Sequence, residues 1–469
     1  MTLKSNKAPS LGVLILAAGQ GTRMVSSLPK VLHPIGGRPM LAYLLRLANA
    51  LKPAGLGVVV GHQEELLRKE VSQNARSWGL SRPVTFIRQK ELAGSGAAVI
   101  EALPFLKKFQ TALVLCGDTP LLTFDTLYAL VNAHRADKGQ VTLLSARVPS
   151  PKGYGRVVRS PLGEVLRIVE EAHLAAKEAS INEVNSGAYC FEVPLLVEAL
   201  KELTPQGPKK ERYLTDCLEH IRRKGGRVAA HLAPNHEEIT GINNRVQLAQ
   251  AERVLNRRAL ERLMFSGVGV SDPAHTYIDA DVEVGPDTVL LPGVVLRGKT
   301  KIGPRCRIGP YSLIEDSAIG AECSVAFSQV SGARILEKCS IGPFAHIRPE
   351  SVIGPRAKVG NFSEVKASRV GMGSKVPHLS YIGDSDIAED VNVGAGTITC
   401  NYDGERKHRT HIAAKAFIGS NATLVPTARV APLRIGRGAL VAAGSVITEH
   451  VPDGARAFGR ARQENKARE

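Results

Sequence analysis

An aliphatic residue recurs every six positions through long stretches of the second half of the chain. The first run keeps this spacing without exception: Ile278, Val284, Leu290, Leu296, Ile302, Ile308 and Ile314. After a slip the spacing resumes at Ile335, and shorter runs carry it to Ile447. Six residues turn an α-helix through about 600°, so these side chains could not share one helix face. A triangular β-coil fits, because one aliphatic residue points inward on each side and three hexapeptides close a coil.

Two further features of the repeat region are a set of regularly spaced cysteines and one interruption of the six-residue spacing. Cys306, Cys323 and Cys339 lie about one coil apart, so we expect them to stack in the core. The seven cysteines of the chain include no C-x-x-C pair, which favours reduced thiols in a cytoplasmic protein over metal ligands or disulfides. Between Ile398 and Ile412 the period fails, and a turn-rich, charged segment intervenes. We expect that segment to leave the coil as a loop, where functional groups often lie.

The first half of the chain follows a different pattern, in which apolar runs alternate with helical stretches up to about Gly241. This alternation predicts a Rossmann-like α/β domain, with a mostly parallel sheet and helices on both faces. Ligands of such sheets bind at the carboxyl ends of strands, where Gly19 and Asp118 fall. The expected strands are 13–16, 57–60, 84–87, 112–115 and 141–146, and the expected helices are 40–51 and 64–72.

A segment without proline or glycine separates the two halves. Residues 244–265 are rich in Arg, Leu, Ala, Gln and Glu, which predicts one long helix. We therefore expect three parts: a nucleotide-binding domain at 1–243, a linker helix at 244–265, and a β-helix domain with a C-terminal tail at 266–469.

The strand at 13–16 runs into a glycine-rich turn, Leu16-Ala17-Ala18-Gly19-Gln20-Gly21-Thr22-Arg23-Met24, which Leu28-Pro29-Lys30-Val31-Leu32 closes. Glycines let backbone N–H groups approach a phosphate, and Arg23 and Lys30 add positive charge for a triphosphate. The string is neither a Walker loop nor a dinucleotide fingerprint. It resembles the signature of sugar-phosphate nucleotidyltransferases, which join a sugar 1-phosphate to a nucleoside triphosphate.

Other candidate residues have two readings each when they are taken singly. Asp118, at the end of a strand, is either a cap or an oxygen ligand for Mg²⁺. Gln89 and the Gly94-Ser95-Gly96 turn either read a base edge or form a plain loop. His378 is either a structural histidine or the base that acetyl transfer to an amine requires.

Taken together, these strings resemble one family over nearly the entire chain. Gly153-Tyr154-Gly155-Arg156, Gly241-Ile242-Asn243-Asn244-Arg245, and the segments 378–384 and 392–402 complete the match. The family is that of the bacterial bifunctional N-acetylglucosamine-1-phosphate uridylyltransferases/glucosamine-1-phosphate acetyltransferases. The resemblance implies a left-handed parallel β-helix that acetylates glucosamine 1-phosphate with acetyl-CoA. The other domain would then couple the product with UTP, as in the synthesis of cell-wall and lipopolysaccharide precursors.

The resemblance also implies the roles of residues in the first half. The nucleotide would be held by Leu16, Ala17, Ala18, Gly19 and Lys30, with Arg23 as a catalytic residue facing its phosphates. Asp118 and Asn243 would hold Mg²⁺. The uracil and sugar contacts would come from Gln89, Gly94, Ser95, Gly117, Gly155, Glu170 and Asn185.

In the β-helix half, the family pattern makes His378 the catalytic base. Glu364 is a possible orienting partner, and Tyr381 and Asn401 would lie beside the reacting groups. The sugar phosphate would be bound by Arg348, Lys366, Tyr381 and Asn392, and acetyl-CoA by Ala395, Asn401, Tyr402, Ser420, Ala443 and Arg460. The resemblance further implies a homotrimer with the acetyl-transfer site between subunits.

The sequence departs from the family pattern at several places. Gln20 stands where lysine is common, Cys116 replaces a more usual tyrosine, and Ala97 stands where histidine is frequent. Pro377 precedes the expected base, and the stretch 426–432 is about five residues longer than usual, which bears on the register of Ala443.

The charge of the chain limits its partners. The formal net charge is +17, but the excess is spread evenly: 31 basic and 21 acidic residues through Asn243, then 30 and 23. Without a basic arm or an aromatic stripe we expect no nucleic-acid partner, and phosphorylated small molecules fit better. No apolar run reaches the ~20 residues that span a bilayer, so we expect no membrane insertion.

Two alternatives stay open at this point. One is a nucleotidyltransferase with a single activity, whose β-helix only assembles subunits; the intact His378, Tyr381 and Asn401 argue against it. The other is a non-catalytic interaction protein, against which the intact Arg23, Lys30, Asp118 and Asn243 argue.

Overall fold

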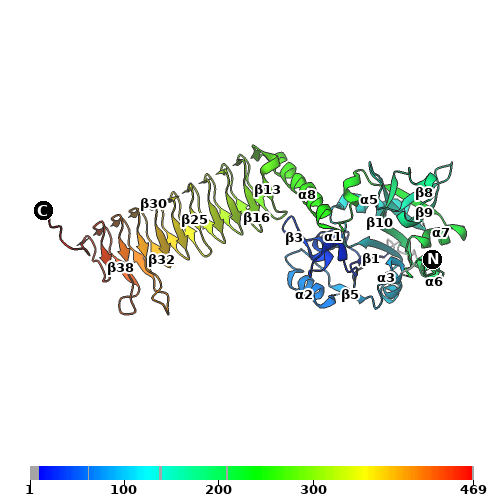
Figure 1. Ribbon diagram of the computed structural model, residues 1–469, viewed down its shortest axis with the longest axis horizontal. Coiled ribbons are helices and arrows are strands. Elements are labelled where there is room, and N and C mark those ends of the chain that lie inside the picture. The colour runs from blue at the N-terminus through cyan, green and yellow to red at the C-terminus, as the bar shows by residue number, and fades with distance from the viewer. Residues whose placement is uncertain (1–9, 62, 137–139, 208–209, 467–469) are drawn as a thin grey trace, which may run out of the picture. The chain divides into compact units, whose positions relative to one another are not determined.

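The computed structural model describes residues 10–61, 63–136, 140–207 and 210–466 (Figure 1). It divides into two compact units, Met1–Leu255 and Asn256–Glu469. The division falls inside the helix α8, Arg245–Phe265, which occupies the segment expected as a linker helix. The ends of the expected domains, 1–9 and 467–469, lie outside the described residues.

The first unit contains a mostly parallel sheet, as the sequence predicts. Its main strands lie in the order β11-β7-β10-β6-β1-β4-β5, and the pairs β7–β11, β1–β6, β1–β4 and β4–β5 are parallel. All five expected strands are present, extended by one or two residues at their ends. Their bounds are β1 Leu11–Leu16, β4 Gly55–Val60, β5 Val84–Arg88, β6 Thr111–Cys116 and β7 Val141–Arg147, followed by β10 Glu183–Glu192 and β11 Val228–Leu232.

Strand β10 is the exception to the parallel order. It runs antiparallel to both β6 and β7 and has a register shift between Asn185 and Tyr189. The hairpin of β8 (Arg156–Arg159) and β9 (Val165–Val169) pairs with its first part. The alternation of runs in the sequence does not reveal this inserted strand, because polar residues such as Glu183 and Asn185 interrupt its apolar pattern.

Helices cover both faces of this sheet, because successive strand residues point to opposite sides. Val13 and Ile15 of β1 pack into one core, and Leu14 between them packs into the other. The first core is covered by α1 (Met40–Ala50), α2 (Glu64–Asn74) and α5 (Phe124–Ala136). The second core is covered by α3 (Ser95–Glu101), α4 (Leu103–Leu106), α6 (Val193–Lys201) and α7 (Asp216–Arg223).

The second unit is a left-handed parallel β-helix built from three sheets of short strands. Through most of the coil, each strand pairs with the third strand after it. For example, β15 (Val289–Leu290) pairs with β18 (Arg307–Ile308), which pairs with β21 (Ser324–Val325). Leu290 is matched with Ile308 and Ile308 with Val325, so one coil takes 18 residues and the next takes 17.

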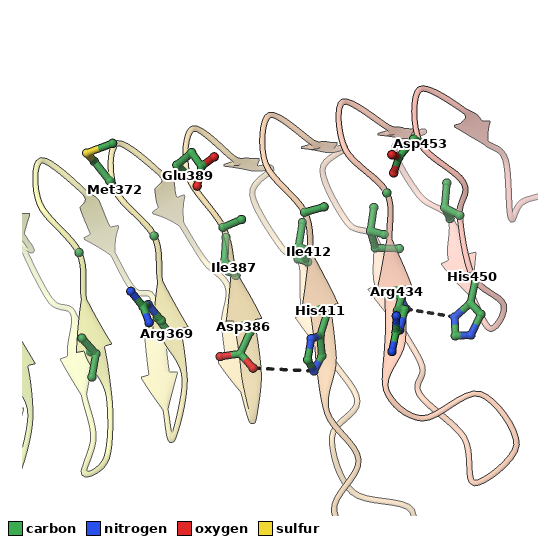
Figure 2. A pocket seen from close by; sticks show the side chains of 18 of the residues that line it. Arg369, Met372, Asp386, Ile387, Glu389, His411, Ile412, Arg434, His450 and Asp453 are labelled. Carbon is green, nitrogen blue, oxygen red and sulfur yellow. Dashed lines mark hydrogen bonds and ion pairs between the residues drawn. The ribbon is translucent and has the colours of Figure 1, made fainter.

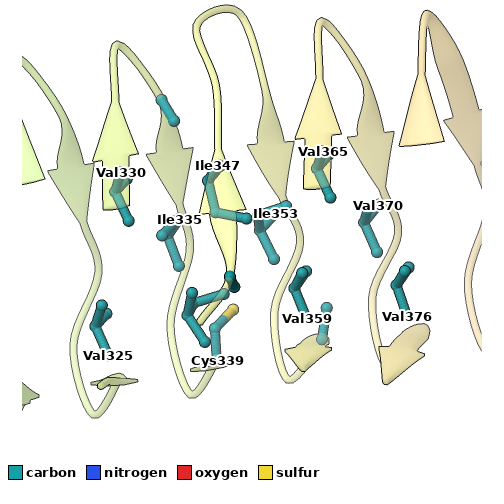
Figure 3. Close-up of a cluster of buried hydrophobic side chains, with 14 of the residues drawn as sticks. Val325, Val330, Ile335, Cys339, Ile347, Ile353, Val359, Val365, Val370 and Val376 are labelled. Atoms are coloured by element: carbon teal, nitrogen blue, oxygen red, sulfur yellow. The ribbon is translucent and has the colours of Figure 1, made fainter. Parts of the chain in front are cut away.

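The inward side chains form one continuous core (Figure 3). The apparent slip after Ile314 is filled by Ile319, Val325 and Val330, which are all buried. Three of the four steps from Ile314 to Ile335 are five residues long instead of six, and a strict count of six therefore overlooks them. The coil shortens at its corners while each strand keeps its partner.

The three cysteines stack in this core, as predicted. The Cys323 amide donates to Cys306 Sγ at 3.4 Å, and the Cys339 amide donates to Cys323 Sγ at 3.4 Å. Each of these residues is only 2% exposed. Small residues hold the same corner in neighbouring coils, Thr288 before the cysteines and Ala357 after them, because the inner corner has little room.

The charged segment leaves the coil as a loop between β34 (Ile398–Thr399) and β35 (Thr410–Ile412). The inward position of β34 is taken by Thr399, while Ile398 is exposed. Inside the loop, His408 Nε2 lies 2.6 Å from Asp403 Oδ2, and the His408 amide donates to the Asn401 carbonyl at 2.9 Å. These contacts give the loop a fixed shape. Within the described residues, no helix has the length and apolar character to cross a membrane.

Candidate active sites

A cavity of about 760 Å³ opens at the carboxyl ends of β1, β5 and β6. The register of the parallel pair β1–β6 matches Leu16 with Cys116, so the glycine-rich loop and Asp118 follow neighbouring strand ends. The cavity wall contains the expected nucleotide-binding residues Leu16, Ala17, Ala18, Gly19, Lys30, Gln89, Gly94, Ser95 and Asp118.

Four charged and polar side chains, distant in the sequence, converge beside this cavity. The Lys30 ammonium donates to the Asp118 carboxylate and, at 3.1 Å, to Asn243 Oδ1. Arg23 donates to the same Asn243 oxygen at 2.9 Å. The Ile242 amide donates to the Asp118 carbonyl at 2.9 Å, which places Asn243 next to Asp118.

Local backbone geometry makes this convergence possible. Gly21 has a φ of +64°, and a Cβ there would lie 2.6 Å from Lys30 Cβ, so only glycine lets the lysine approach the turn. Asn244 does not join the cluster: its Oδ1 accepts from the Gln247 amide at 2.9 Å at the start of α8. Of the two adjacent asparagines, Asn243 is therefore the one directed at Asp118.

The cluster fits a hard divalent cation. Two oxygen atoms, one of Asp118 and one of Asn243, already converge on a single positive group, the Lys30 ammonium. Mg²⁺ prefers such oxygens and commonly takes one or two protein ligands together with substrate phosphates. Among the described residues, no group of three His, Cys, Asp or Glu side chains could hold a metal by itself. Two protein oxygens leave the remaining positions of an octahedral Mg²⁺ to water and substrate phosphates.

The expected base-reading loop lies on one side of the cavity. Gln89 is 6% exposed and its amide donates to the Gly94 carbonyl at 3.3 Å. Ser95 Oγ accepts from the Leu214 amide at 3.1 Å. Residues 211–216, which the sequence analysis did not select, therefore support this loop.

The expected sugar-binding residues form a second group. The Asn185 amide donates to the Gly155 carbonyl at 2.9 Å, and a Cβ on Gly155 would lie 3.5 Å from Glu170 Oε2. Glu170 Oε1 accepts from Thr215 Oγ1 at 2.9 Å. Gly117 serves the strand end itself, since a Cβ there would lie 2.8 Å from the Leu16 carbonyl.

Cys116 lies in the cavity wall as a neutral thiol. Burial, and secondarily the negative charge of Asp118, raises the pKa of Cys116 to about 12. Its Sγ donates to the Gly187 carbonyl at 3.4 Å. The thiol therefore adds no charge to the phosphate region at neutral pH.

In the second unit, the expected base His378 ends β30 (Lys375–His378). Its Nδ1 lies 2.5 Å from Oδ1 of Asn361, which ends the neighbouring strand β27 (Lys358–Asn361). An amide oxygen can only accept, so Nδ1 is the donor in this contact and Nε2 is directed elsewhere. His378 itself is exposed.

The residue beside His378 is therefore Asn361, in place of the expected Glu364. Glu364 lies on β28 (Glu364–Lys366), where it accepts from Arg348 at 2.7 Å. The sequence analysis overlooked Asn361, although its distance of 17 residues from His378 is one coil and was a usable signal. Glu364 was selected because it is a carboxylate. The β-helix instead brings together residues that are one coil apart in the sequence.

The other expected acetyl-transfer residues lie along neighbouring coils. Tyr381 pairs in register with Glu364, and Lys366 pairs with Gly383. Asn392 on β33 (Asn392–Val393) pairs with Lys375 of β30. Asn401 is buried and donates to the Asp384 carboxylate, whereas the neighbouring Tyr402 is exposed.

Three of the expected acetyl-CoA residues, Ala395, Ser420 and Ala443, occupy one corner in successive coils. The Asn421 amide donates to the Ala395 carbonyl at 2.7 Å, and the Gly444 amide donates to the Ser420 carbonyl at 2.8 Å. The long stretch after residue 425 is accommodated between β37 (Thr423–Leu424) and β38 (Leu433–Ile435). Ile418 still pairs with Val441, so Ala443 keeps its place one coil after Ser420. Arg460 Cδ lies 3.8 Å from the point where a Cβ on Gly444 would stand.

A cavity of about 930 Å³ lies over a different sheet of the coil, and its wall contains none of these residues. Figure 2 shows a row of outward side chains from consecutive coils along it. Arg369, Asp386, His411 and Arg434 are in register, and His411 Nε2 lies 3.8 Å from Asp386 Oδ2. The sequence analysis did not identify this row.

Comparison with known proteins agrees with both halves of the geometry. Residues 13–181 match the model of the MobA-like NTP transferase domain, and residues 281–316 and 332–367 match that of the bacterial transferase hexapeptide. The protein named "Bifunctional protein GlmU" from Caldanaerobacter subterraneus subsp. tengcongensis is 47% identical over 453 residues, covering 97% of this chain and 96% of that protein. The proteins of the same name from Geobacillus sp. (strain WCH70) and Syntrophomonas wolfei are 44% and 42% identical, over 97% and 98% of this chain and 96% and 99% of theirs.

A nucleotidyltransferase unit followed by a hexapeptide β-helix defines the class of protein, a transferase built from these two units. With this identity over almost its whole length, the chain belongs to the family of bifunctional GlmU proteins. It is a bifunctional enzyme with uridylyltransferase and acetyltransferase activities, and the resemblance read from the sequence is confirmed. The single-activity alternative is not favoured.

Proposed function

We propose that the chain makes UDP-N-acetylglucosamine in two steps. The β-helix unit acetylates glucosamine 1-phosphate with acetyl-CoA, and the α/β unit transfers UMP from UTP to the N-acetylated product, releasing pyrophosphate. The observation that carries this proposal is the convergence of Arg23, Lys30, Asp118 and Asn243 beside a cavity whose wall includes Gln89, Gly94 and Ser95.

The uridylyl step needs alignment and charge neutralisation more than a strong base. The sugar phosphate is already anionic at neutral pH, and its oxygen attacks the α-phosphorus of UTP while the bond to pyrophosphate breaks. Arg23 and Lys30 are placed to neutralise the phosphates, and the turn at Ala17–Gly19 offers backbone donors. Gly155, Glu170 and Asn185 would orient the sugar.

Asp118 and Asn243 would hold Mg²⁺, which supplies Lewis-acid stabilisation of phosphate charge when bound. The same two oxygens also accept from the Lys30 ammonium. Lys30 would then move its ammonium from these oxygens toward the phosphates when substrates enter. Its side chain is 15% exposed, which leaves it able to contact both.

In the acetyl step, His378 Nε2 would accept a proton as the amine of glucosamine 1-phosphate attacks the thioester carbonyl. The new C–N bond forms a tetrahedral intermediate, the C–S bond then breaks, and the proton passes to the leaving thiolate. Asn361 fixes the histidine tautomer through Nδ1. An amide holds the imidazolium less tightly than a carboxylate would, which favours passing the proton on.

We propose that the chain acts as a homotrimer in the cytoplasm and that a second subunit completes the acetyl site. His378, Ser420, Ala443 and Arg460 are exposed in a single chain, while acetyl transfer benefits from exclusion of water. An exposed aromatic ladder supports association, because contiguous apolar surface usually marks an interface. It consists of Tyr311, Phe327, Phe344 and Phe362, with ring centroids 5.9, 5.6 and 5.3 Å apart.

One assay tests both activities. Purified protein receives glucosamine 1-phosphate, acetyl-CoA, UTP and Mg²⁺, and free thiol and pyrophosphate are followed separately. His378→Ala should remove thiol release but keep pyrophosphate release from N-acetylglucosamine 1-phosphate, and Asp118→Ala should do the reverse. Chelation of the metal should stop pyrophosphate release alone. A wild-type protein that makes pyrophosphate but never thiol would refute the acetyl half.

A further inference from the structure

Residues 211–216 run from the base-reading loop to the sugar-binding group. At the first end, the Arg212 amide donates to the Ala93 carbonyl at 2.8 Å, and the Gly96 amide donates to the Arg212 carbonyl at 2.8 Å. The Leu214 amide adds its bond to Ser95 Oγ at 3.1 Å. Three hydrogen bonds thus bind this segment, which we call the strap, along the loop.

The contact between strap and loop is close. Gly94 has a φ of +94°, and a Cβ there would lie 2.5 Å from the Arg212 carbonyl oxygen. Any larger residue at this position would push the strap away from the loop. The glycine that the sequence analysis assigned to base reading therefore also admits the strap.

At the other end, Thr215 contacts the sugar-binding group. Its Oγ1 donates to Glu170 Oε1 at 2.9 Å, and Thr215 is only 5% exposed. Glu170 Oε2 faces Gly155, since a Cβ there would lie 3.5 Å away. One carboxylate oxygen is thus committed to the strap, and the other faces the group assigned to the sugar.

Packing around Thr215 holds the donor of this hydrogen bond in place. Leu214 before it, and Cys217 and Leu218 after it in α7, are buried in the same core as Val165 and Ile168 of β9. Strand β9 ends at Val169, directly before Glu170. The donor and the acceptor are therefore mounted on two elements that share one core.

A second carboxyl group, that of Asp216, lies near the hydrogen bond between Thr215 and Glu170. Asp216 follows Thr215 directly, and burial together with the nearby Glu170 carboxylate raises the pKa of Asp216 to about 6. The two carboxyl groups are close enough to influence each other, and the hydroxyl of Thr215 is the donor that holds Glu170 in one orientation. Gln206 donates to Asp216 Oδ2 at 2.8 Å on the other side.

We propose that Thr215 is a positioning residue of the uridylyltransferase: its hydroxyl holds Glu170 toward the sugar hydroxyls, and the strap ties that carboxylate to the base-reading loop. This inference rests on the proposed function, in which Glu170 contacts the sugar. It adds a residue and a segment to which neither the sequence nor the family resemblance gave a role.

The test is Thr215→Val, which keeps the side-chain shape but removes the hydroxyl, with Thr215→Ser as the conservative control. Hydrogen bonds to charged groups contribute about 1.5–3 kcal/mol, so loss of this one should raise the KM for N-acetylglucosamine 1-phosphate about tenfold or more. The KM for UTP should stay within about twofold, and Thr215→Ser should restore the wild-type value. Thiol release by the same chain checks that the protein is intact.

A double-mutant cycle separates positioning from general damage. In the Glu170→Gln background, Thr215→Val should have little further effect on the sugar-phosphate KM, because both changes act through one contact. If Thr215→Val does not fold, Thr215→Ala replaces it in the same cycle, since a smaller side chain does not overpack the core.

The outcomes distinguish the inference from the function on which it rests. An unchanged KM in Thr215→Val, or an equal rise in the KM values of both substrates, would overturn the positioning role. A wild-type protein that releases no pyrophosphate with N-acetylglucosamine 1-phosphate would overturn the proposed function instead.

Discussion

The two units of this chain build their sites in different ways. In the α/β unit, side chains up to 220 positions apart, such as Arg23 and Asn243, meet beside a cavity because parallel strands end at one edge. In the β-helix, His378 and Asn361 meet because they are one coil apart, and they lie on an open surface. A sheet edge can enclose a substrate with its own loops, whereas a coil presents a line of residues. The comparison teaches that a β-helix site calls for a second surface.

The largest expected effect concerns that second surface. Changing both Phe344 and Phe362 of the aromatic ladder to arginine should separate the subunits, because two interface losses of about 2 kcal/mol each weaken association roughly 10³-fold. Thiol release should fall steeply at low protein concentration, while pyrophosphate release should continue. Sedimentation alongside both assays measures this, with Tyr128→Arg, an exposed aromatic change in the other unit, as the control. Full thiol release from a monomer would refute the comparison.

A smaller effect should follow from changing the partner of the base. Asn361→Leu leaves His378 in place but frees its ring, and misplacement of a catalytic group can cost about 10²-fold in rate. We expect that loss in thiol release only. Asn361→Asp should instead stabilise the imidazolium, because a carboxylate attracts the charged ring, and so shift the pH profile of thiol release upward. Glu364→Gln, which leaves His378 Nδ1 untouched, should not shift this profile.

Core substitutions test whether the two units are independent in stability. Ile347→Ala in the coil and Leu14→Ala in the sheet both remove fully buried side chains, each at a cost of about 2–5 kcal/mol. Each change should lower the unfolding temperature of its own unit and leave the other transition in place. Scanning calorimetry checks this, and a single transition that moves with both variants would show that the units unfold together.

The smallest expected effect depends on pH and is confined to the α/β unit. The pKa of Asp216 is about 6 in the folded chain and about 3.8 otherwise, so the folded state binds the extra proton between these values. Stability should therefore fall as pH rises from about 4 to 6 and stay lower above that. Because the group is half exposed, solvent screening limits the effect to about 1 kcal/mol. Asp216→Asn should flatten this dependence in denaturant titrations, and an unchanged slope would contradict the assignment.

The sequence predicted the elements of the fold because their signals are periodic. The six-residue repeat, the linker helix and the five strands of the sheet all follow from local patterns. The features that the sequence did not predict depend on how the strands pair with one another. The antiparallel β10 has an ordinary apolar run broken by polar residues, and the five-residue steps at Ile319, Val330 and Ile335 become regular only when the coils are stacked.

The site could be predicted in part for the same reason. The glycine-rich turn and Asp118 carry strong local signals, and the structure brings them together with Asn243. Asn361 and Thr215 act through neighbours that are distant in the sequence, and neither belongs to a motif. Their roles depend on register and on core packing, which a linear reading does not contain.

The stretch between Val425 and Leu433 has a practical consequence. It leaves the coil while Ile418 and Val441 stay paired on either side, so the length of this loop is independent of the framework that carries it. A foreign peptide placed there would be displayed from a rigid support at a known height along the coil. Natural chains can use the same freedom, since the added length at this corner changes the surface while Ile418 and Val441 keep their pairing.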